Sequence, residues 1–162
     1  MELLNAREEH YEKILEYNEI LVDVLSPMDM DKMLEMKEET SMFKVVVEND
    51  KVCAFLMAFE NGTSYDSVNY KWFEKEYEKF LYIDRIVIPE EHQRKGIGKM
   101  LYDEVFSFAK EKGVDTVTCE IDIKPSNPKS LAFHKEMGFE EVGSQVIKGG
   151  EKEVYLQAKR LD

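Results

Sequence analysis

The order of the predicted elements along the chain indicates an α/β protein. β-Branched and aromatic runs that predict strands lie toward both ends, and two strand-then-helix units lie between them. No Pro/Gly-rich linker, internal repeat or low-complexity tract divides the 162 residues. The sequence therefore predicts one α/β domain over residues 1–162.

The N-terminal part predicts a short strand and two helices. Residues 2–5 suit the strand, and Asn5 is a candidate N-cap for a helix with these apolar residues at helical spacing: Tyr11, Ile14, Leu15, Leu21, Val22 and Leu25. Ser26 and Pro27 suit the N-cap and first position of a second helix. The methionines of that helix are typical of a pliable core, and a flexible pocket wall is the alternative.

The rest of the chain alternates strand and helix signals. In order, these are a hairpin of residues 43–48 and 51–60 around Asn49-Asp50, a helical face of Tyr70, Phe73 and Tyr77, a strand over 81–88, a helix over 96–112, a strand over 115–123, a short helix from Asn127 to Gly138, and a hairpin of residues 141–147 and 151–159.

Composition argues against several classes of protein. The net charge of −12 disfavours non-specific nucleic-acid binding. No apolar run approaches the length of a membrane span, and the N-terminus does not resemble a secretory signal, so we expect a cytoplasmic protein. Cys53 and Cys119 lie in strand-like runs and are expected to be buried, reduced thiols.

The charge is uneven. Residues 1–80 carry 19 acidic and 9 basic residues, whereas residues 81–162 carry 15 and 13. An acidic substrate side would favour a cationic small molecule or peptide, and the alternative is a solvated, solubilising surface.

HQRKGIGKML, residues 92–101, predicts an anion-binding loop. Gly96 and Gly98 let the backbone approach an oxygen closely, and the helix that follows points unpaired N–H groups at the loop. Arg94, Lys95 and Lys99 add positive charge. Neither the spacing of a Walker A loop nor a GxGxxG fingerprint fits, because Met100 follows the lysine and Leu101 stands where a third glycine is needed. An ordinary tight turn before a helix is the alternative.

Two motifs resemble the GNAT superfamily of acetyl-CoA-dependent N-acetyltransferases. QRKGIG, residues 93–98, resembles the family's (Q/R)xxGx(G/A) loop, and NPKSLAFHKEMGF, residues 127–139, resembles its NxxAxxFYxxxGF motif. YDSVNYKWF, residues 65–73, is similar to a segment of a poorly characterised bacterial branch. The resemblance implies a central mixed, mostly antiparallel sheet of about six or seven strands, splayed at the two central strands, with about four or five helices.

The resemblance also implies cofactor contacts, with acetyl-CoA as co-substrate and no metal. Backbone amides of the loop would hold the CoA pyrophosphate, and backbone groups of the strand before it would pair with the pantetheine arm. The loop residues are Gln93, Arg94, Lys95, Gly96, Ile97, Gly98 and Lys99, and the strand residues are Ile86, Val87 and Ile88. Asn127, Ser130 and Phe133 would lie beside the cofactor. A helix N-cap at Asn127 and a core position for Phe133 are the alternatives.

Acetyl transfer to an amine needs a base for the ammonium and a proton for the departing thiolate. Members of the family often carry a carboxylate base near this place, so the resemblance implies that Asp84, two positions before the pantetheine-pairing residues, is the candidate base; an ion pair with a neighbouring lysine or arginine is the alternative. Glu120 and Asp122 are weaker candidates. His134 stands where the family commonly has the acidic tyrosine, and we take it as the candidate acid, with a packing role as the alternative. In that case Tyr82 or Tyr102 assists, or CoA leaves as the thiolate.

These readings lead to competing hypotheses. The first is an N-acetyltransferase that moves acetyl from acetyl-CoA to an amine of a small molecule or peptide by direct transfer in a ternary complex. The second is a non-catalytic acyl-CoA-binding or regulatory module, and the third, a nucleoside triphosphate domain, is disfavoured by the missing Walker residues. No nucleic acid or membrane partner is expected, and a homodimer is suggested by family habit alone.

Overall fold

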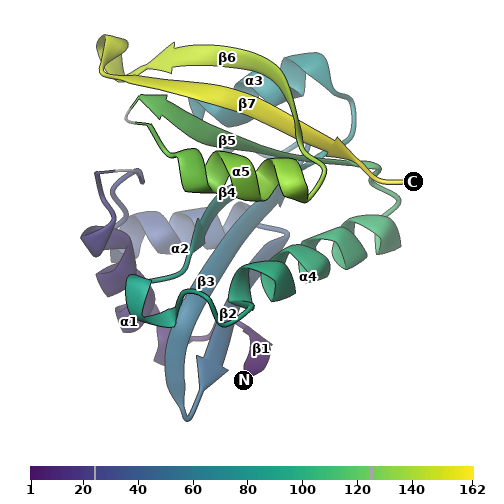
Figure 1. Cartoon of the computed structure of the whole chain (residues 1–162). Coiled ribbons are helices and arrows are strands. Elements are labelled where there is room, and N and C mark those ends of the chain that lie inside the picture. Colours follow the sequence, from purple (N-terminus) through teal and green to yellow (C-terminus); the bar gives the residue numbers. More distant parts are fainter. Residues whose placement is uncertain (24, 125) are drawn as a thin grey trace. The chain divides into compact units, whose positions relative to one another are not determined.

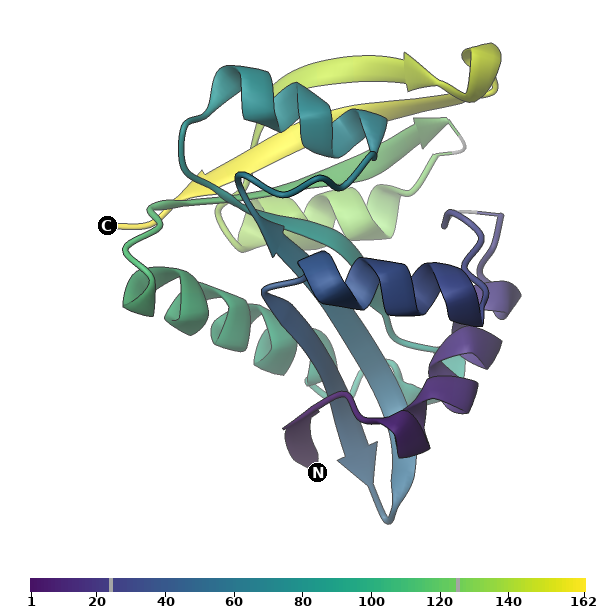
Figure 2. The ribbon, with the colours of Figure 1, turned by 180° about the vertical axis from the view of Figure 1, so that it is seen from behind.

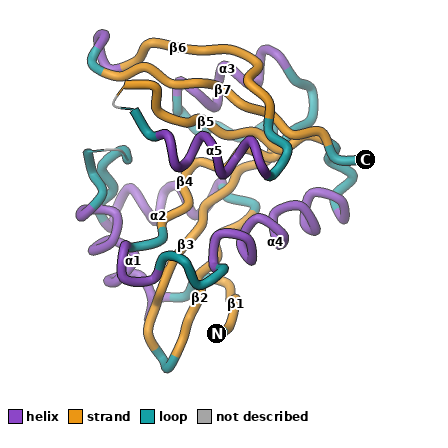
Figure 3. The backbone as a smooth tube through the Cα atoms, in the orientation of Figure 1, coloured by secondary structure: helices purple, strands orange, loops and turns teal. Residues whose placement is uncertain are grey.

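The computed structural model describes residues 1–23, 25–124 and 126–162. These residues form seven β-strands and five α-helices, coloured along the chain in Figure 1 and by type in Figure 3. In chain order they are β1 (Glu2–Asn5), α1 (Glu8–Ile20), α2 (Met30–Glu39), β2 (Met42–Glu48), β3 (Lys51–Glu60), α3 (Val68–Glu76), β4 (Leu81–Val87), α4 (Ile97–Glu111), β5 (Thr116–Lys124), α5 (Pro128–Glu136), β6 (Glu140–Ile147) and β7 (Lys152–Arg160). The predicted α/β class is confirmed, and the sheet is mixed, because β4 and β5 pair in parallel whereas β1–β2, β2–β3, β5–β7 and β6–β7 are antiparallel.

The chain divides into two compact units. One comprises Met1–Phe59 and Ile83–Phe108, and the other comprises Glu60–Tyr82 and Ala109–Asp162. Strand β4 begins in the second unit and continues in the first, so each hydrogen-bonded strand pair can be described within one unit. The single domain over residues 1–162 stays a prediction.

The first unit holds strands β1, β2, β3 and the greater part of β4, neighbours in that order. Asn49 and Asp50 turn the β2–β3 hairpin with φ of 52° and 63°, the pair of positive values that a two-residue turn of this kind requires. Helices α1 and α2 lie on one face of β2 and β3, and α4 lies on the other (Figures 1 and 2). Strand β3 is therefore buried on both faces from Val52 to Phe59, which explains its continuous apolar sequence.

Two predicted helix starts are wrong. Asn5 does not cap α1, because it still pairs with Lys44 in the β1–β2 ladder, and Arg7 is the N-cap instead. Ser26 does not cap α2; Asp29 does, and its Oδ1 accepts a hydrogen bond of 2.8 Å from the backbone N–H of Lys32. The methionines of this segment are largely core, with Met28, Met33 and Met36 buried, whereas Met30 and Leu34 are exposed.

The second unit holds the start of β4 followed by β5, β7 and β6, with α3 and α5 on opposite faces of these strands (Figures 1 and 2). Tyr70 and Phe73 of α3 are fully buried, and both rings contact Tyr82. The predicted aromatic face of α3 is thus confirmed for these two residues, while Tyr77 stands at the C-cap of the helix. Asn127 caps α5, as predicted: its Oδ1 accepts a hydrogen bond of 3.3 Å from the backbone N–H of Ser130.

Candidate acetyl-CoA site

The loop between β4 and α4 is tied to the end of the strand. A single 3-10 turn, Glu90–His92, follows the buried Pro89. Gln93 then donates from Nε2 to the carbonyl oxygen of Ile88 at 3.0 Å. This contact holds the start of the loop against the strand that precedes it.

Two residues of the loop have left-handed backbone conformations. Arg94 has a φ of 63° and Gly96 a φ of 80°. A Cβ built on Gly96 would meet nothing within 4 Å, so this position requires glycine for its backbone angle and not for space. Gly98 lies in the first turn of α4.

The N-terminus of α4 provides backbone donors for an anion. The N–H of Met100 donates to the carbonyl of Gly96 at 3.1 Å, the first bond of the helix, so the N–H groups of Ile97, Gly98 and Lys99 precede any intrahelical acceptor. Lys99 Nζ lies 2.8 Å from Asp103 and Lys95 Nζ lies 3.9 Å from Glu48. Acidic neighbours therefore offset these two lysines, so the backbone donors are the groups of this loop that are best suited to an anion.

An open groove of about 430 Å³ continues from the loop along α4. Its lining residues are Leu3, Gly96, Lys99, Met100, Asp103, Glu104 and Ser107. The loop and helix N-terminus fit a pyrophosphate, because an exposed turn with positive φ and several amide donors is the arrangement that such an anion needs.

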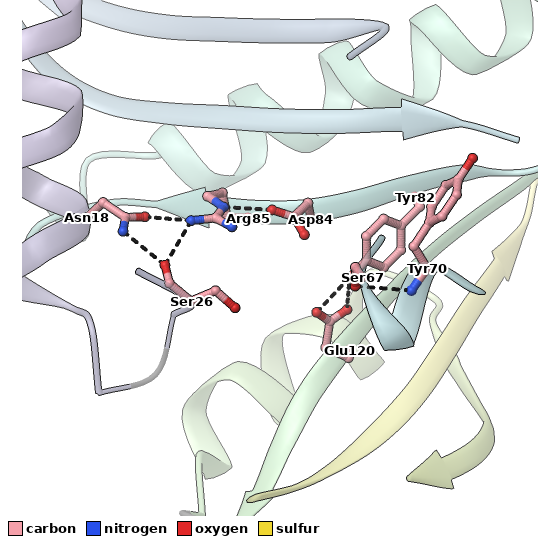
Figure 4. A network of polar contacts seen from close by, with 8 residues as sticks. All are labelled: Asn18, Ser26, Ser67, Tyr70, Tyr82, Asp84, Arg85 and Glu120. Carbon is pink, nitrogen blue, oxygen red and sulfur yellow. Dashed lines mark hydrogen bonds and ion pairs between the residues drawn. The ribbon is translucent and has the colours of Figure 1, made fainter. Parts of the chain in front are cut away.

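Asp84 belongs to a buried polar network in the first unit, shown in Figure 4. Its Oδ2 accepts from Arg85 Nε at 2.6 Å, although strand alternation places neighbouring residues on opposite faces. Arg85 Nη1 donates to Asn18 Oδ1 at 2.9 Å and to the carbonyl of Ser26 at 3.1 Å. The side chains of Arg85 and Asp84 are only 4% and 6% exposed, so this ion pair is shielded from water.

A second polar group lies in the second unit. The hydroxyl of the fully buried Tyr82 contacts both carboxylate oxygens of Glu120, at 2.7 and 2.8 Å (Figure 4). Tyr70 OH donates to the carbonyl of Glu60 at 2.6 Å. The ring of Tyr82, which also contacts Tyr70 and Phe73, therefore lies beside the half-buried carboxylate of Glu120. Asp122, further along β5, forms an ion pair of 3.2 Å with Lys152, and burial raises its pKa above the ordinary value.

The residues predicted from the second motif gather on α5. Asn127 and Ser130 stand at its start, and the ring of Phe133 makes an edge contact with His134. His134 is buried, and its Nδ1 donates to the carbonyl of Ser130 at 2.7 Å. Burial lowers the pKa of His134 below its ordinary value, and the hydrogen bond to Ser130 opposes this.

The predicted site residues thus form two local groups. Ile86, Val87 and Ile88, the loop residues and Asp84 belong to the first unit, whereas Asn127, Ser130, Phe133 and His134 belong to the second. Sequence reasoning missed the link from Asn18 and Ser26 to Arg85. The signal that was present is Arg85 itself, a charged residue inside an otherwise apolar strand.

Both cysteines are buried free thiols, and burial raises the pKa of Cys119 well above its ordinary value. Across residues 1–23, 25–124 and 126–162, no three His, Cys, Asp or Glu side chains gather as a candidate metal site. None of the helices in those ranges has both the length and the apolar run needed to cross a bilayer.

Comparisons with known proteins show the family of this chain and its similarity in fold to solved structures. The model of the acetyltransferase (GNAT) family matches residues 5–139, and the chain belongs to this family. Its fold is similar to that of Naa20 from Chaetomium thermophilum in complex with a bisubstrate analogue, with a TM-score of 0.80 and 18% identity over 99% of this chain and 87% of the other. It is also similar to the ribosomal-protein-S18-alanine N-acetyltransferase from Escherichia coli, with a TM-score of 0.72 and 14% identity over 99% of this chain and 94% of the other. A third similar structure is a NatB acetyltransferase complex bound to CoA and MES, with a TM-score of 0.77 and 14% identity over 100% of both chains.

Proposed function

We propose that this protein is an N-acetyltransferase that moves acetyl from acetyl-CoA to an amine by direct transfer in a ternary complex. The observation that carries the proposal is the loop between β4 and α4, with φ of 63° at Arg94 and 80° at Gly96 before a helix N-terminus. Membership of the acetyltransferase family supports it.

Each group of residues has a proposed task toward the co-substrate. Backbone amides from Arg94 to Lys99 hold the pyrophosphate, Gln93 fixes the loop, and Ile86, Val87 and Ile88 pair with the pantetheine arm. The contacts of Asn127, Ser130 and Phe133 with the same cofactor stay a prediction. When bound, acetyl-CoA supplies the thioester whose acetyl group is transferred.

Asp84 is the proposed base. An alkylamine with a pKa of about 10 is mostly protonated near neutral pH, so a proton must leave before the nitrogen can attack. Arg85 holds Oδ2 of Asp84. Glu120 is a second candidate for the base. Its carboxylate contacts the uncharged hydroxyl of Tyr82, which does not neutralise the negative charge of Glu120 as the Arg85 cation does for Asp84.

His134 as the proton donor to the departing thiolate stays a prediction. Its Nδ1 proton is donated to the carbonyl of Ser130, so Nε2 carries a proton only in the imidazolium form, and burial lowers the pKa of His134 and disfavours that form. If His134 donates, kcat falls as pH rises through this lowered pKa, and His134→Asn, which keeps a donor for the Ser130 carbonyl, abolishes that dependence. A kcat that is flat with pH in both proteins assigns the proton to another group or to solvent.

The acceptor class is proposed from charge. The excess of acidic residues in the N-terminal half favours a cationic amine, either a polyamine or the free α-amine of a peptide. The Escherichia coli relative is named as an alanine N-acetyltransferase of a ribosomal protein, which makes an N-terminal peptide amine a reasonable member of the panel.

The testing experiment is an acceptor screen with acetyl-CoA that reads release of free thiol. Spermidine, an alanine-initiated peptide and the same peptide with a blocked N-terminus are the probes. We expect thiol release with at least one free amine, none with the blocked peptide, and a loss of about 10²-fold or more in kcat for Asp84→Asn with CoA binding retained. Tight acetyl-CoA binding without turnover on any amine would favour the alternative of a non-catalytic acyl-CoA-binding module.

A further inference from the structure

Arg85 is a buried charged residue of the first unit, and its partners come from three places in the chain. Nε meets the carboxylate of the adjacent Asp84, while Nη1 meets Asn18 of α1 and the carbonyl of Ser26 in the α1–α2 connection (Figure 4). The partners Asn18 and Ser26 lie 67 and 59 residues away in sequence. The guanidinium of Arg85 therefore links Asp84, the proposed base, to Ser26 in the α1–α2 connection, which is distant from Asp84 in sequence.

The Ser26 carbonyl is held from two sides. Asn18 Nδ2 donates to it at 3.1 Å, and Arg85 Nη1 donates at the same distance. Asn18 is completely buried, and its amide uses both ends, because Oδ1 accepts from Arg85 while Nδ2 donates to Ser26. An exposed residue of the connection is thus pinned by two buried side chains, and the same contacts restrain the guanidinium plane.

A planar guanidinium transmits this restraint. Its nitrogens lie in one rigid fork, so fixing Nη1 also fixes the direction from which Nε meets a carboxylate. Asp84 Oδ2 is held at 2.6 Å by that Nε, so the orientation of the carboxylate depends on Arg85 and, through it, on Asn18 and Ser26.

We propose that Arg85 is a positioning residue that orients Asp84, and that Asn18 and the Ser26 carbonyl in turn orient Arg85. The inference rests on the proposed function, since it gives Asp84 a catalytic task. It adds that the conformation of the α1–α2 connection at Ser26 controls the rate of acetyl transfer without touching the reacting atoms.

Two variants test the relay without removing the buried charge or Asp84. Asn18→Ala removes the amide that holds both Arg85 and Ser26, and it leaves Asp84 in place. Arg85→Lys keeps the cation but has one nitrogen, which cannot serve Asp84 and the Asn18–Ser26 pair in the same geometry. Arg160→Lys is the matched control, because that side chain is 81% exposed and lies in the other unit.

The measurements are kcat and KM on whichever probe amine the wild-type protein acetylates, the Kd for acetyl-CoA, thermal unfolding, and amide hydrogen exchange of Ser26–Asp29. We expect kcat to fall by about 10- to 100-fold in Asn18→Ala and Arg85→Lys, with faster exchange over Ser26–Asp29 and an unchanged acetyl-CoA Kd. Arg160→Lys should match the wild type throughout. Adding Arg85→Lys to Asp84→Asn should lower kcat by much less than it does alone.

The outcomes separate this inference from the proposed function. If the wild-type protein acetylates none of the probe amines, the proposed function fails and the relay falls with it. If the wild type is active, and Asn18→Ala is folded with faster exchange at Ser26–Asp29 but a wild-type kcat, the connection does not control Asp84 and the relay is overturned. A wild-type kcat in folded Arg85→Lys would overturn it equally.

Discussion

At the scale of single residues, we expect anion binding by the proposed loop to depend on backbone conformation more than on side-chain charge. Gly96 has a φ of 80°, which any residue with a Cβ adopts at a cost of roughly 1–2 kcal/mol. Lys99 is engaged by Asp103 at 2.8 Å, so its charge is already partly offset. The glycines of QRKGIG are therefore the sensitive positions, and Lys99 is an accessory charge.

The corresponding prediction compares three variants of the loop. Gly96→Ala should raise the Kd for CoA by about 5- to 30-fold, the equivalent of its backbone strain. Gly98→Val should also weaken binding, because a branched side chain in the first turn of α4 blocks close approach of an anion. Lys99→Met should change the Kd much less. Isothermal titration with CoA checks this, and equal Kd values for Gly96→Ala and Lys99→Met would contradict it.

His134 makes a prediction about stability against pH. Its folded pKa lies below the ordinary value of 6.5, because burial disfavours the charged imidazolium. Between the folded and the unfolded pKa of His134, the unfolded chain binds more protons than the folded protein. The contribution of His134 to the free energy of unfolding therefore rises with pH through this window, and it is lost progressively as the pH falls below about 6.5. Urea unfolding between about pH 7.5 and 5 should show a steeper loss for the wild type than for His134→Asn. Parallel curves would show that His134 is not the group responsible.

Residue patterns predicted part of the site. The cap at Asn127 follows from local sequence, because it depends on a few adjacent residues. The sequence did not show which neighbouring basic residue would form an ion pair with Asp84. Only the fold shows that Arg85 forms the ion pair with Asp84, and that Nη1 of the same guanidinium donates to Asn18 and to the carbonyl of Ser26.

At the scale of elements, helix positions were easier to predict than helix ends. The apolar spacing found α1 and α2, but their caps lie at Arg7 and Asp29 instead of Asn5 and Ser26. The reason is competition. Asn5 is held in the β1–β2 ladder, and the Ser26 carbonyl is held by Asn18 and Arg85. Long-range contacts thus decide where the chain can begin a helix.

The contact of α3 with β6 offers a packing prediction. A Cβ on Gly143 would lie 2.6 Å from Trp72 Cζ2 and 2.9 Å from Cη2, so a side chain at this position would force the Trp72 ring or β6 to shift. Gly143→Ala should lower the free energy of unfolding by about 1–3 kcal/mol, as overpacking does. Ser144→Ala, on an exposed neighbour, is the control.

Adding Trp72→Phe to Gly143→Ala should recover part of the loss, because the smaller ring leaves room for the methyl group. Urea unfolding of the four proteins measures this. An additive double variant would show that Trp72 is not the obstacle.

At the scale of the whole molecule, the net charge leads to a prediction about the encounter with a cationic acceptor. The chain carries a net charge of −12, and the excess lies in residues 1–80. For a cationic acceptor such as spermidine, kcat/KM should fall several-fold as salt rises from about 0.02 M to about 0.3 M, because screening weakens long-range attraction. A neutral-chain peptide amine should change little. Equal salt dependence for both acceptors would remove the electrostatic argument for a cationic substrate.

The sequence by itself determined the α/β class, the order of strands and helices and the family, because periodicity and short motifs are local properties. The tertiary structure alone decided the surroundings of the candidate base. Asp84 meets Arg85, and Arg85 meets Asn18 and Ser26, which are 67 and 59 residues away in the chain. Such contacts depend on how α1 and its connection pack against β4, and no local pattern records that packing.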